Sequence, residues 1–207
     1  MSTSFDVYPT KDIDLIFGNL LSLANENMRV FFEKQSVDSV PEVLFEVRNK
    51  SSDKKVSSSL DDSLKIPEEH YIWFYVHGVE GGCDAYFWES DESDYEEIYD
   101  SIASLPPNEQ LAWKDMVAKA EACGVTWHFN RSAGQPSFIN IMYGVLAASM
   151  SQLNNGVIYS GDCAWDSQRF PAKGDDFLTW YFNPETAIDP DFKSWSQECI
   201  NDLRTAN

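Results

Sequence analysis

The chain has 207 residues, of which 43% are hydrophobic, and includes 7 Trp, 9 Tyr and 13 Phe. This composition excludes a disordered chain and allows one packed core. Fifteen Lys and Arg face 34 Asp and Glu, for a formal net charge of −19, which argues against nucleic acid and anionic membrane as partners because both need clustered cations. A basic protein, a cationic substrate or a metal remains compatible, and solubility alone would also account for the charge.

The first elements predicted are a strand and a long helix. Residues 4–8 favour a short strand that Pro9 ends, and Thr10 or Asp12 offers an N-cap for a helix to about Lys34. Apolar residues recur there at steps of three and four, which predicts one stripe packed on a sheet. The stripe consists of Ile13, Phe17, Leu20, Leu21, Ala24, Met28 and Phe31.

Residues 43–47 alternate in a way that favours a strand, and residues 49–65 are rich in Ser, Lys and Asp. We interpret 49–65 as a flexible loop inserted between strands. Two runs of β-formers follow, at 71–77 and 83–88, and residues 78–82 supply the glycines that a hairpin turn needs.

The second half predicts helices at 107–123, 137–153, 174–181 and 190–203, with strands at 125–129 and 157–159. Pro107 suits a first helical turn and Gly124 a helix end, while small residues such as Gly144 permit close packing of the 137–153 helix. The order of elements predicts a single α+β domain over 1–207, with a mixed or antiparallel sheet and packed helices.

The negative charge is concentrated in one stretch, residues 66–113, which contains no Lys or Arg. Its densest part, 89–100, repels itself by a few tenths of a kcal/mol per neighbouring pair. Three interpretations are open: a solvated loop, a docking surface for a cationic protein with Tyr95 and Tyr99 as anchors, or a metal loop. The spacing of acids lacks the glycine and the terminal glutamate of an EF-hand, so no metal site is predicted.

Cysteine chemistry is a second candidate activity. Cys83 or Cys163 would need His77 or His128 as its base, but no cysteine-hydrolase signature surrounds either thiol, and a strand cysteine is usually a core residue. No zinc-ligand spacing, phosphate loop or dinucleotide fingerprint occurs, so no cofactor is predicted.

The first five residues lack a basic and apolar leader and the apolar runs are short, which predicts a cytoplasmic protein with reduced cysteines and no membrane span.

Residues 161–166, Gly-Asp-Cys-Ala-Trp-Asp, form a turn that follows a predicted strand. Asp162, Trp165 and Asp166 would form a contact loop there, or Asp162 would cap the turn while Trp165 is buried. Trp73, Trp88 and Trp127 lie in predicted strands, and we assign them to the core rather than to carbohydrate stacking.

Two parts of the chain resemble a known family. They are Phe-Asp-Val-Tyr-Pro-Thr at 5–10 with the apolar helix after it, and the 161–166 turn followed by Phe170-Pro171 and Asp-Asp-Phe-Leu-Thr-Trp-Tyr-Phe at 175–182. They resemble the immunity proteins of bacterial polymorphic toxins, from contact-dependent inhibition and type VI secretion systems. The resemblance implies no catalysis and tight binding of one cognate toxin domain in the cytoplasm.

The function we expect is therefore neutralisation of a toxin domain, basic at its contact surface, by occlusion of its active or substrate-binding site. The alternatives are a small cysteine-dependent hydrolase and an acidic binding or regulatory module for another basic protein. The expected toxin contacts are Asp84, Glu89, Asp91, Glu92, Asp94, Tyr95, Glu96, Glu97, Tyr99, Asp100, Asp162, Trp165 and Asp166.

Overall fold

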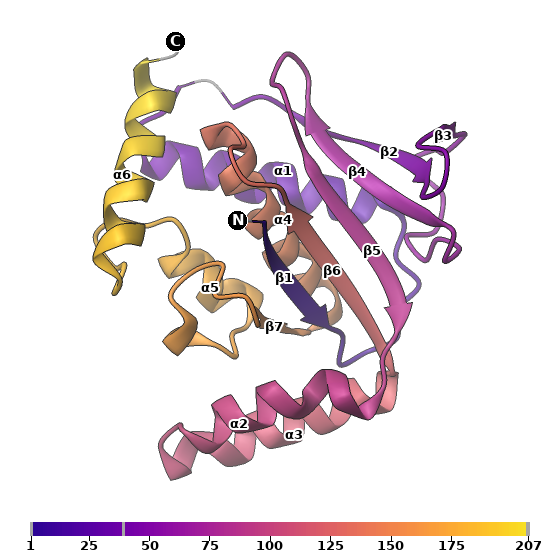
Figure 1. Ribbon diagram of the computed structural model, residues 1–207, viewed down its shortest axis with the longest axis vertical. Helices are drawn as coiled ribbons and strands as arrows, with labels where there is room; N and C mark the ends of the chain where they lie inside the picture. Colours follow the sequence, from indigo (N-terminus) through magenta and orange to yellow (C-terminus); the bar gives the residue numbers. More distant parts are fainter. Residues whose placement is uncertain (1, 39, 206–207) are drawn as a thin grey trace.

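The computed structural model describes residues 2–38 and 40–205 and is built around a seven-stranded sheet in which each pair of neighbours is antiparallel (Figure 1). The strand order is β3-β2-β4-β5-β6-β1-β7. The strands are β1 (Thr3–Tyr8), β2 (Val43–Asn49), β3 (Lys55–Val56), β4 (His70–Val76), β5 (Cys83–Glu89), β6 (Val125–Arg131) and β7 (Val157–Tyr159). The prediction of a single α+β domain is confirmed.

One face of the sheet is covered by helices. Phe5, Phe129, Ala85 and Ile72 stand side by side across four strands and are all fully buried. Helices α1 (Phe17–Lys34) and α4 (Ser137–Asn154) pack behind this face in the view of Figure 1, because their apolar side chains need the same cover.

Two further helices complete this layer. α5 (Gly174–Trp180) and α6 (Pro190–Thr205) flank α4. Gly144 on α4 touches the ring of Tyr181, since a Cβ there would stand 2.3 Å from the ring. The small residue predicted to permit close packing thus lies at a point of close approach.

The remaining helices form an α2–α3 hairpin, defined here as residues 92–123, that projects from one end of the sheet (Figure 1). It contains the short 3₁₀ turn η1 (Glu92–Tyr95), α2 (Glu96–Ala103) and α3 (Pro107–Cys123). A second, smaller core fixes it to the ends of β1 and β7. That core consists of Tyr8, Tyr95, Ile98, Ile102, Val117, Ala120 and Val157.

The first helix begins later than predicted. Ile16, and not Thr10 or Asp12, is its N-cap residue, and Ile13 is exposed. Segment 60–64 takes over the capping role: the amide of Phe17 donates to the carbonyl of Asp62, and the amide of Gly18 to that of Leu60. A tertiary contact therefore sets the start of the helix where local sequence favoured an earlier one.

The predicted loop at 49–65 contains β3, which pairs with β2. Its last part is fixed, because Leu64 is buried and its amide donates to the carbonyl of Leu15. Flexibility of the remaining part stays a prediction.

The densest part of the acidic stretch is not a loop, which was one interpretation of it, because η1 and α2 lie there. Asp91 caps η1 by accepting a hydrogen bond from the amide of Ser93, and the amide of Asp91 donates to Asp94. Glu96 and Glu97 then occupy the first turn of α2, where the helix dipole favours negative charge.

Among the described residues, no helix is both long and apolar enough to cross a bilayer.

Candidate functional site

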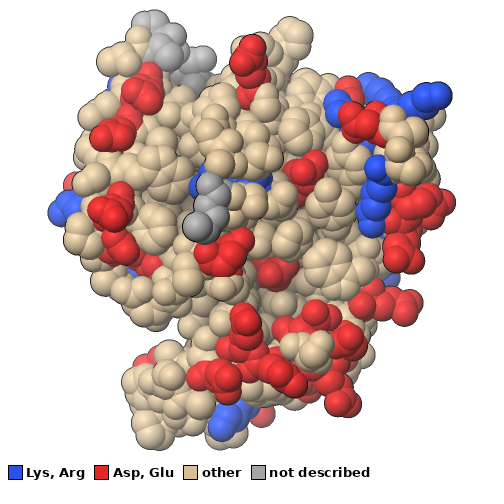
Figure 2. Space-filling model, viewed as in Figure 1, with Lys and Arg blue, Asp and Glu red and all other residues tan. Residues whose placement is uncertain are grey.

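The first candidate surface is the acidic side of the α2–α3 hairpin. We call the acidic surface the side chains of Glu89, Asp91, Glu92, Asp94, Glu96, Glu97 and Asp100, all on β5, η1 and α2 or between them. Figure 2 shows acidic side chains gathered over this hairpin, below the sheet. In the described part of the chain, none of these carboxylates forms an ion pair with a Lys or Arg.

Most of these acidic residues belong to one of two groups, those that cap a helix and those that are free in solvent. Asp91 and Asp94 form the capping interactions, and the hydroxyl and amide of Ser93 lower the pKa of Asp91, which keeps it ionised. Glu92, Glu96, Glu97 and Asp100 are exposed, and among the described residues their carboxylates accept no hydrogen bond. These four are therefore available to a partner without disturbing the fold.

The predicted turn after β7 meets this surface. A Cβ on Gly161 would stand 2.7 Å from the Glu97 carboxylate, and the Tyr159 hydroxyl donates to the Glu97 carbonyl over 3.2 Å. The next residue, Asp162, is exposed and accepts a hydrogen bond from the Ser4 hydroxyl over 3.0 Å. Two acidic segments that lie more than fifty residues apart are thus joined on one side of the molecule.

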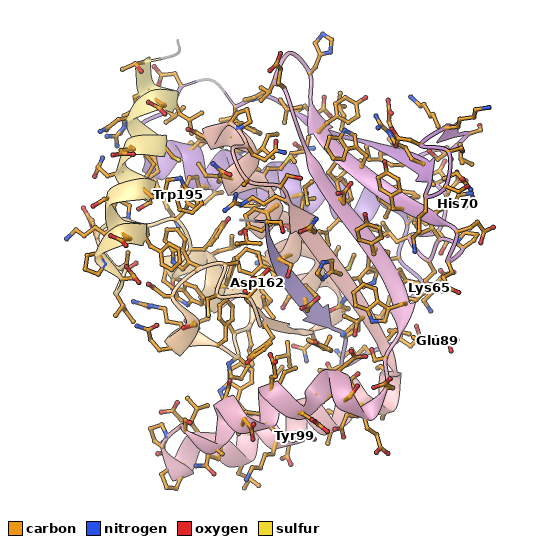
Figure 3. All side chains as sticks on the ribbon, in the orientation of Figure 1. Lys65, His70, Glu89, Tyr99, Asp162 and Trp195 are labelled. Atoms are coloured by element: carbon orange, nitrogen blue, oxygen red, sulfur yellow. The ribbon has the colours of Figure 1, made fainter. Side chains whose placement is uncertain are left out.

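The second candidate surface is the face of the sheet opposite α1 and α4. We call it the open face; Tyr71, Trp73 and Tyr75 on β4, Asp84, Tyr86 and Trp88 on β5, and His128 and Asn130 on β6 are its half-buried residues. Strand alternation places them away from the core. Figure 3 shows this face crossed by ring side chains between the hairpin and β3.

The core assignment of Trp73 and Trp88 is therefore wrong, whereas that of Trp127 is confirmed by its 4% exposure. Strand alternation could have separated these residues: Trp88 points to the same side of the sheet as Asp84 and Tyr86, whereas Trp127 points to the same side as Phe129. Both alternating sets of residues in these strands are rich in aromatic side chains, so residue type alone did not distinguish the buried face from the open face.

The centre of the open face carries charged and polar groups. His128 lies with Nδ1 2.6 Å from a carboxylate oxygen of Asp6, and its ring centroid is 5.4 Å from that of Trp88. Burial raises the pKa of Asp84 to about 6, although the positive charge of Arg48 acts in the opposite direction. Aromatic rings beside carboxylates form a surface suited to cationic side chains.

Three of the predicted contacts are wrong because their side chains are buried. Tyr95 is 2% exposed and its hydroxyl donates to the Ala120 carbonyl. Trp165 has no exposed surface and stacks on Phe182, with centroids 5.0 Å apart. Asp166 is 1% exposed and accepts from the amides of Ile188 and Asp189. Burial of Trp165 was the alternative interpretation of the 161–166 turn.

The other predicted contacts remain accessible. Tyr99 is half-buried, and burial together with Glu121 raises its pKa to about 12. Asp84 belongs to the open face, and Asp162 together with the exposed acids of the acidic surface lines the hairpin side.

The predicted Cys83 nucleophile does not fit the structure. Cys83 points into the core, and burial raises the pKa of its thiol well above the usual value, the reverse of activation. Cys163 is exposed, but within residues 2–38 and 40–205 no histidine or carboxylate bonds to it. The same residues contain no group of three or more His, Cys, Asp or Glu placed to hold a metal ion.

Comparisons with protein-family models, curated proteins and solved structures find no match.

Proposed function

We propose that the chain is a non-catalytic inhibitor that binds a basic protein domain through the acidic surface and the adjoining open face. The observation that supports this most is the absence of any Lys or Arg ion pair to the acidic surface among the described residues. Because neighbouring carboxylates repel one another, a cationic surface that covers them lowers their electrostatic free energy.

The shape of the hairpin supports binding by occlusion. It projects from the sheet and is fixed by a small core, so its acidic side is free on a protruding element (Figure 1). A protruding acidic helix can enter the basic cleft of an enzyme that handles phosphates. The partner we propose is a cognate toxin domain met in the cytoplasm, in line with the family resemblance.

Electrostatic steering gives this arrangement a kinetic advantage. Complementary charge raises association rates to roughly 10⁸ M⁻¹s⁻¹ at low salt. Fast capture matters for an inhibitor that must act before its target does. Affinity should accordingly fall as ionic strength rises.

A regulatory module for another basic protein would use the same surfaces, and only the identity of the partner separates it from an inhibitor. The hydrolase alternative has less support, since its Cys83 thiol is buried.

The test first asks whether the gene beside this one encodes a basic toxin domain, and then co-expresses the two chains, with growth as the readout, and measures association kinetics of the purified pair. The variant Glu92→Gln, Glu96→Gln, Glu97→Gln, Asp100→Asn removes four charges without removing a described hydrogen bond. Its control, Asp38→Asn, Asp61→Asn, Glu185→Gln, Glu198→Gln, removes four exposed charges elsewhere. We expect the first variant to lower the association rate about tenfold and to weaken protection, and the control to change both far less. Equal effects of both variants, or no protection by the wild type, would contradict the proposal.

A further inference from the structure

A groove of about 420 Å³ opens where β5 ends, next to the acidic surface. It is lined by Ile66, Glu68, Phe87, Trp88 and Glu89. The two glutamates come from different segments, Glu68 from the turn before β4 and Glu89 from the end of β5, and both are exposed. Figure 3 places Glu89 at the tip of the β5 arrow, beside the loop that carries Lys65.

The carboxylates of this groove have no cation of their own. In the described residues neither Glu68 nor Glu89 forms an ion pair, and the nearby ammonium of Lys65 lies 2.5 Å from Asp12 instead. The groove thus combines an indole, two apolar side chains and two unpaired negative charges.

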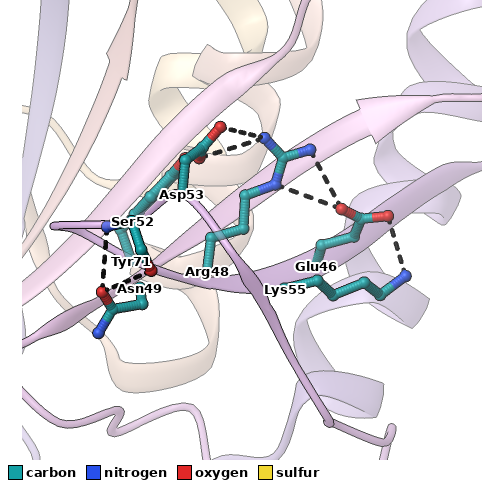
Figure 4. A network of polar contacts seen from close by, with 7 residues as sticks. All are labelled: Glu46, Arg48, Asn49, Ser52, Asp53, Lys55 and Tyr71. Atoms are coloured by element: carbon teal, nitrogen blue, oxygen red, sulfur yellow. Dashed lines mark hydrogen bonds and ion pairs between the residues drawn. The ribbon is translucent and has the colours of Figure 1, made fainter.

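The same sheet already shows how such a set of groups holds a guanidinium. The carbon of the Arg48 guanidinium lies 5.4 Å from the centroid of the Trp73 ring. Its Nε and one terminal nitrogen donate to a single oxygen of Glu46, over 3.3 and 3.1 Å, as Figure 4 shows. Trp73 and Trp88 lie on the same open face of neighbouring strands. Glu46 is the cross-strand partner of Trp73 on that face, whereas Glu89 follows Trp88 along β5 and shares only the groove at the end of the strand with it. The Arg48 contacts therefore show that an indole and a carboxylate together hold a guanidinium in this fold, and the groove at Trp88 offers the same two kinds of group without a cation from the described residues.

We propose that the groove at Trp88 receives an arginine side chain of the basic partner, which stacks on the indole and bonds to Glu89 and Glu68. Arginine fits better than lysine, because a planar guanidinium stacks on an aromatic ring while it forms paired bonds to a carboxylate. This inference rests on the proposed function in that it supplies one anchor of the same interface. It also makes a claim of its own about which side chain enters.

The test uses nona-arginine as the probe and the indole N–H signals of ¹⁵N-labelled protein as the readout. Trp88→Leu identifies the Trp88 signal by its loss. Glu68→Gln and Glu89→Gln each remove one charge at the groove, and Glu92→Gln removes one exposed charge on η1 as the matched control. Nona-lysine is the control for side-chain chemistry.

We expect nona-arginine to shift the Trp88 signal in a saturable manner. Each groove variant should weaken this binding about two- to fivefold, the range typical of one exposed ion pair, and Glu92→Gln should weaken it less. Nona-lysine should move the signal less at equal occupancy.

Binding that leaves the Trp88 signal in place, equal effects of Glu89→Gln and Glu92→Gln, or no binding at all would each overturn the arginine site. None of these results alters the co-expression test, so the inhibitor proposal stands or fails separately. Thermal melts of every variant confirm that the fold is kept.

Discussion

The hydroxyl of Tyr95 donates a hydrogen bond to the carbonyl of Ala120 over 3.2 Å and so connects the start of α2 to the last turns of α3. The Tyr95 ring also packs against Tyr8 on β1, with centroids 5.1 Å apart. One buried side chain of the small core thus contacts both α3 and β1. The acidic surface is displayed on a folded element whose position depends on this contact.

Tyr95→Ala should lower the free energy of unfolding by about 3–5 kcal/mol, as expected for truncation of a buried aromatic residue. Tyr95→Phe keeps the ring and loses only the hydrogen bond, so it should lower it by about 1 kcal/mol. Urea unfolding followed by circular dichroism measures both. A loss in Tyr95→Phe as large as that in Tyr95→Ala would show that the ring packing contributes little.

Asp84 should make the protein less stable as the pH rises. Burial raises the pKa of this carboxyl from 3.8 to about 6 in the folded state, so the folded chain holds the proton more tightly than the unfolded chain. Stability from this group is present below pH 4 and is lost as the pH rises through 6. Asp84→Asn removes the effect.

We expect Asp84→Asn to be about 1 kcal/mol more stable than the wild type at pH 8 and to lose that advantage near pH 4. The full shift would correspond to about 3 kcal/mol at 1.36 kcal/mol per unit, but solvent screening of a half-buried group reduces it. Urea denaturation at both pH values gives the difference. An advantage that is the same at pH 4 and pH 8 would contradict the raised pKa.

Most strands and helices followed from sequence patterns, and the exceptions have physical causes. The β4–β5 hairpin and the α4 helix have strong local signals, namely a glycine turn and a long apolar run. Helix α2 was missed because its acids obscured the three- and four-residue spacing of Tyr95, Ile98 and Ile102. The faces of Trp73 and Trp88 depend on which side α1 and α4 cover, and that is a tertiary property.

The candidate site likewise has one part that the sequence indicated and one part that it did not. Negative charge in one stretch could be recognised from the sequence, and its exposed members are where a partner can reach them. The groove at Trp88 could not be foreseen, because Glu68 and Glu89 come from separate segments of the chain that line the same groove only in the folded protein.

The four cysteines should react with a thiol reagent in the order of their exposure. Cys163 is exposed and should react first, Cys123 is half-buried, and Cys83 and Cys199 are buried with raised pKa values. Mass spectrometry after timed alkylation at neutral pH, with a urea-unfolded sample as the control, gives the four rates. Rapid modification of Cys83 in the folded protein would revive the hydrolase hypothesis.

Asp166 should matter for stability and not directly for partner binding. Its buried carboxylate accepts from the amides of Ile188 and Asp189 over 2.9 and 3.0 Å, and it lies 3.4 Å from Nε of Arg169. Asp166→Ala leaves the two amides without their acceptor and Arg169 without this ion-pair partner, and it should lower the free energy of unfolding by about 2–4 kcal/mol.

The exposed Asp162 provides the matched comparison within the same turn. Asp162→Asn should change stability by less than about 1 kcal/mol while it slows association with a basic partner, because its charge adjoins the acidic surface. Urea unfolding and stopped-flow association measure the two effects on each variant. If Asp166→Asn, which keeps a side-chain acceptor, slowed association more than Asp162→Asn without loss of fold, the buried residue would have to be exposed during binding. The assignment of the turn would then be reversed.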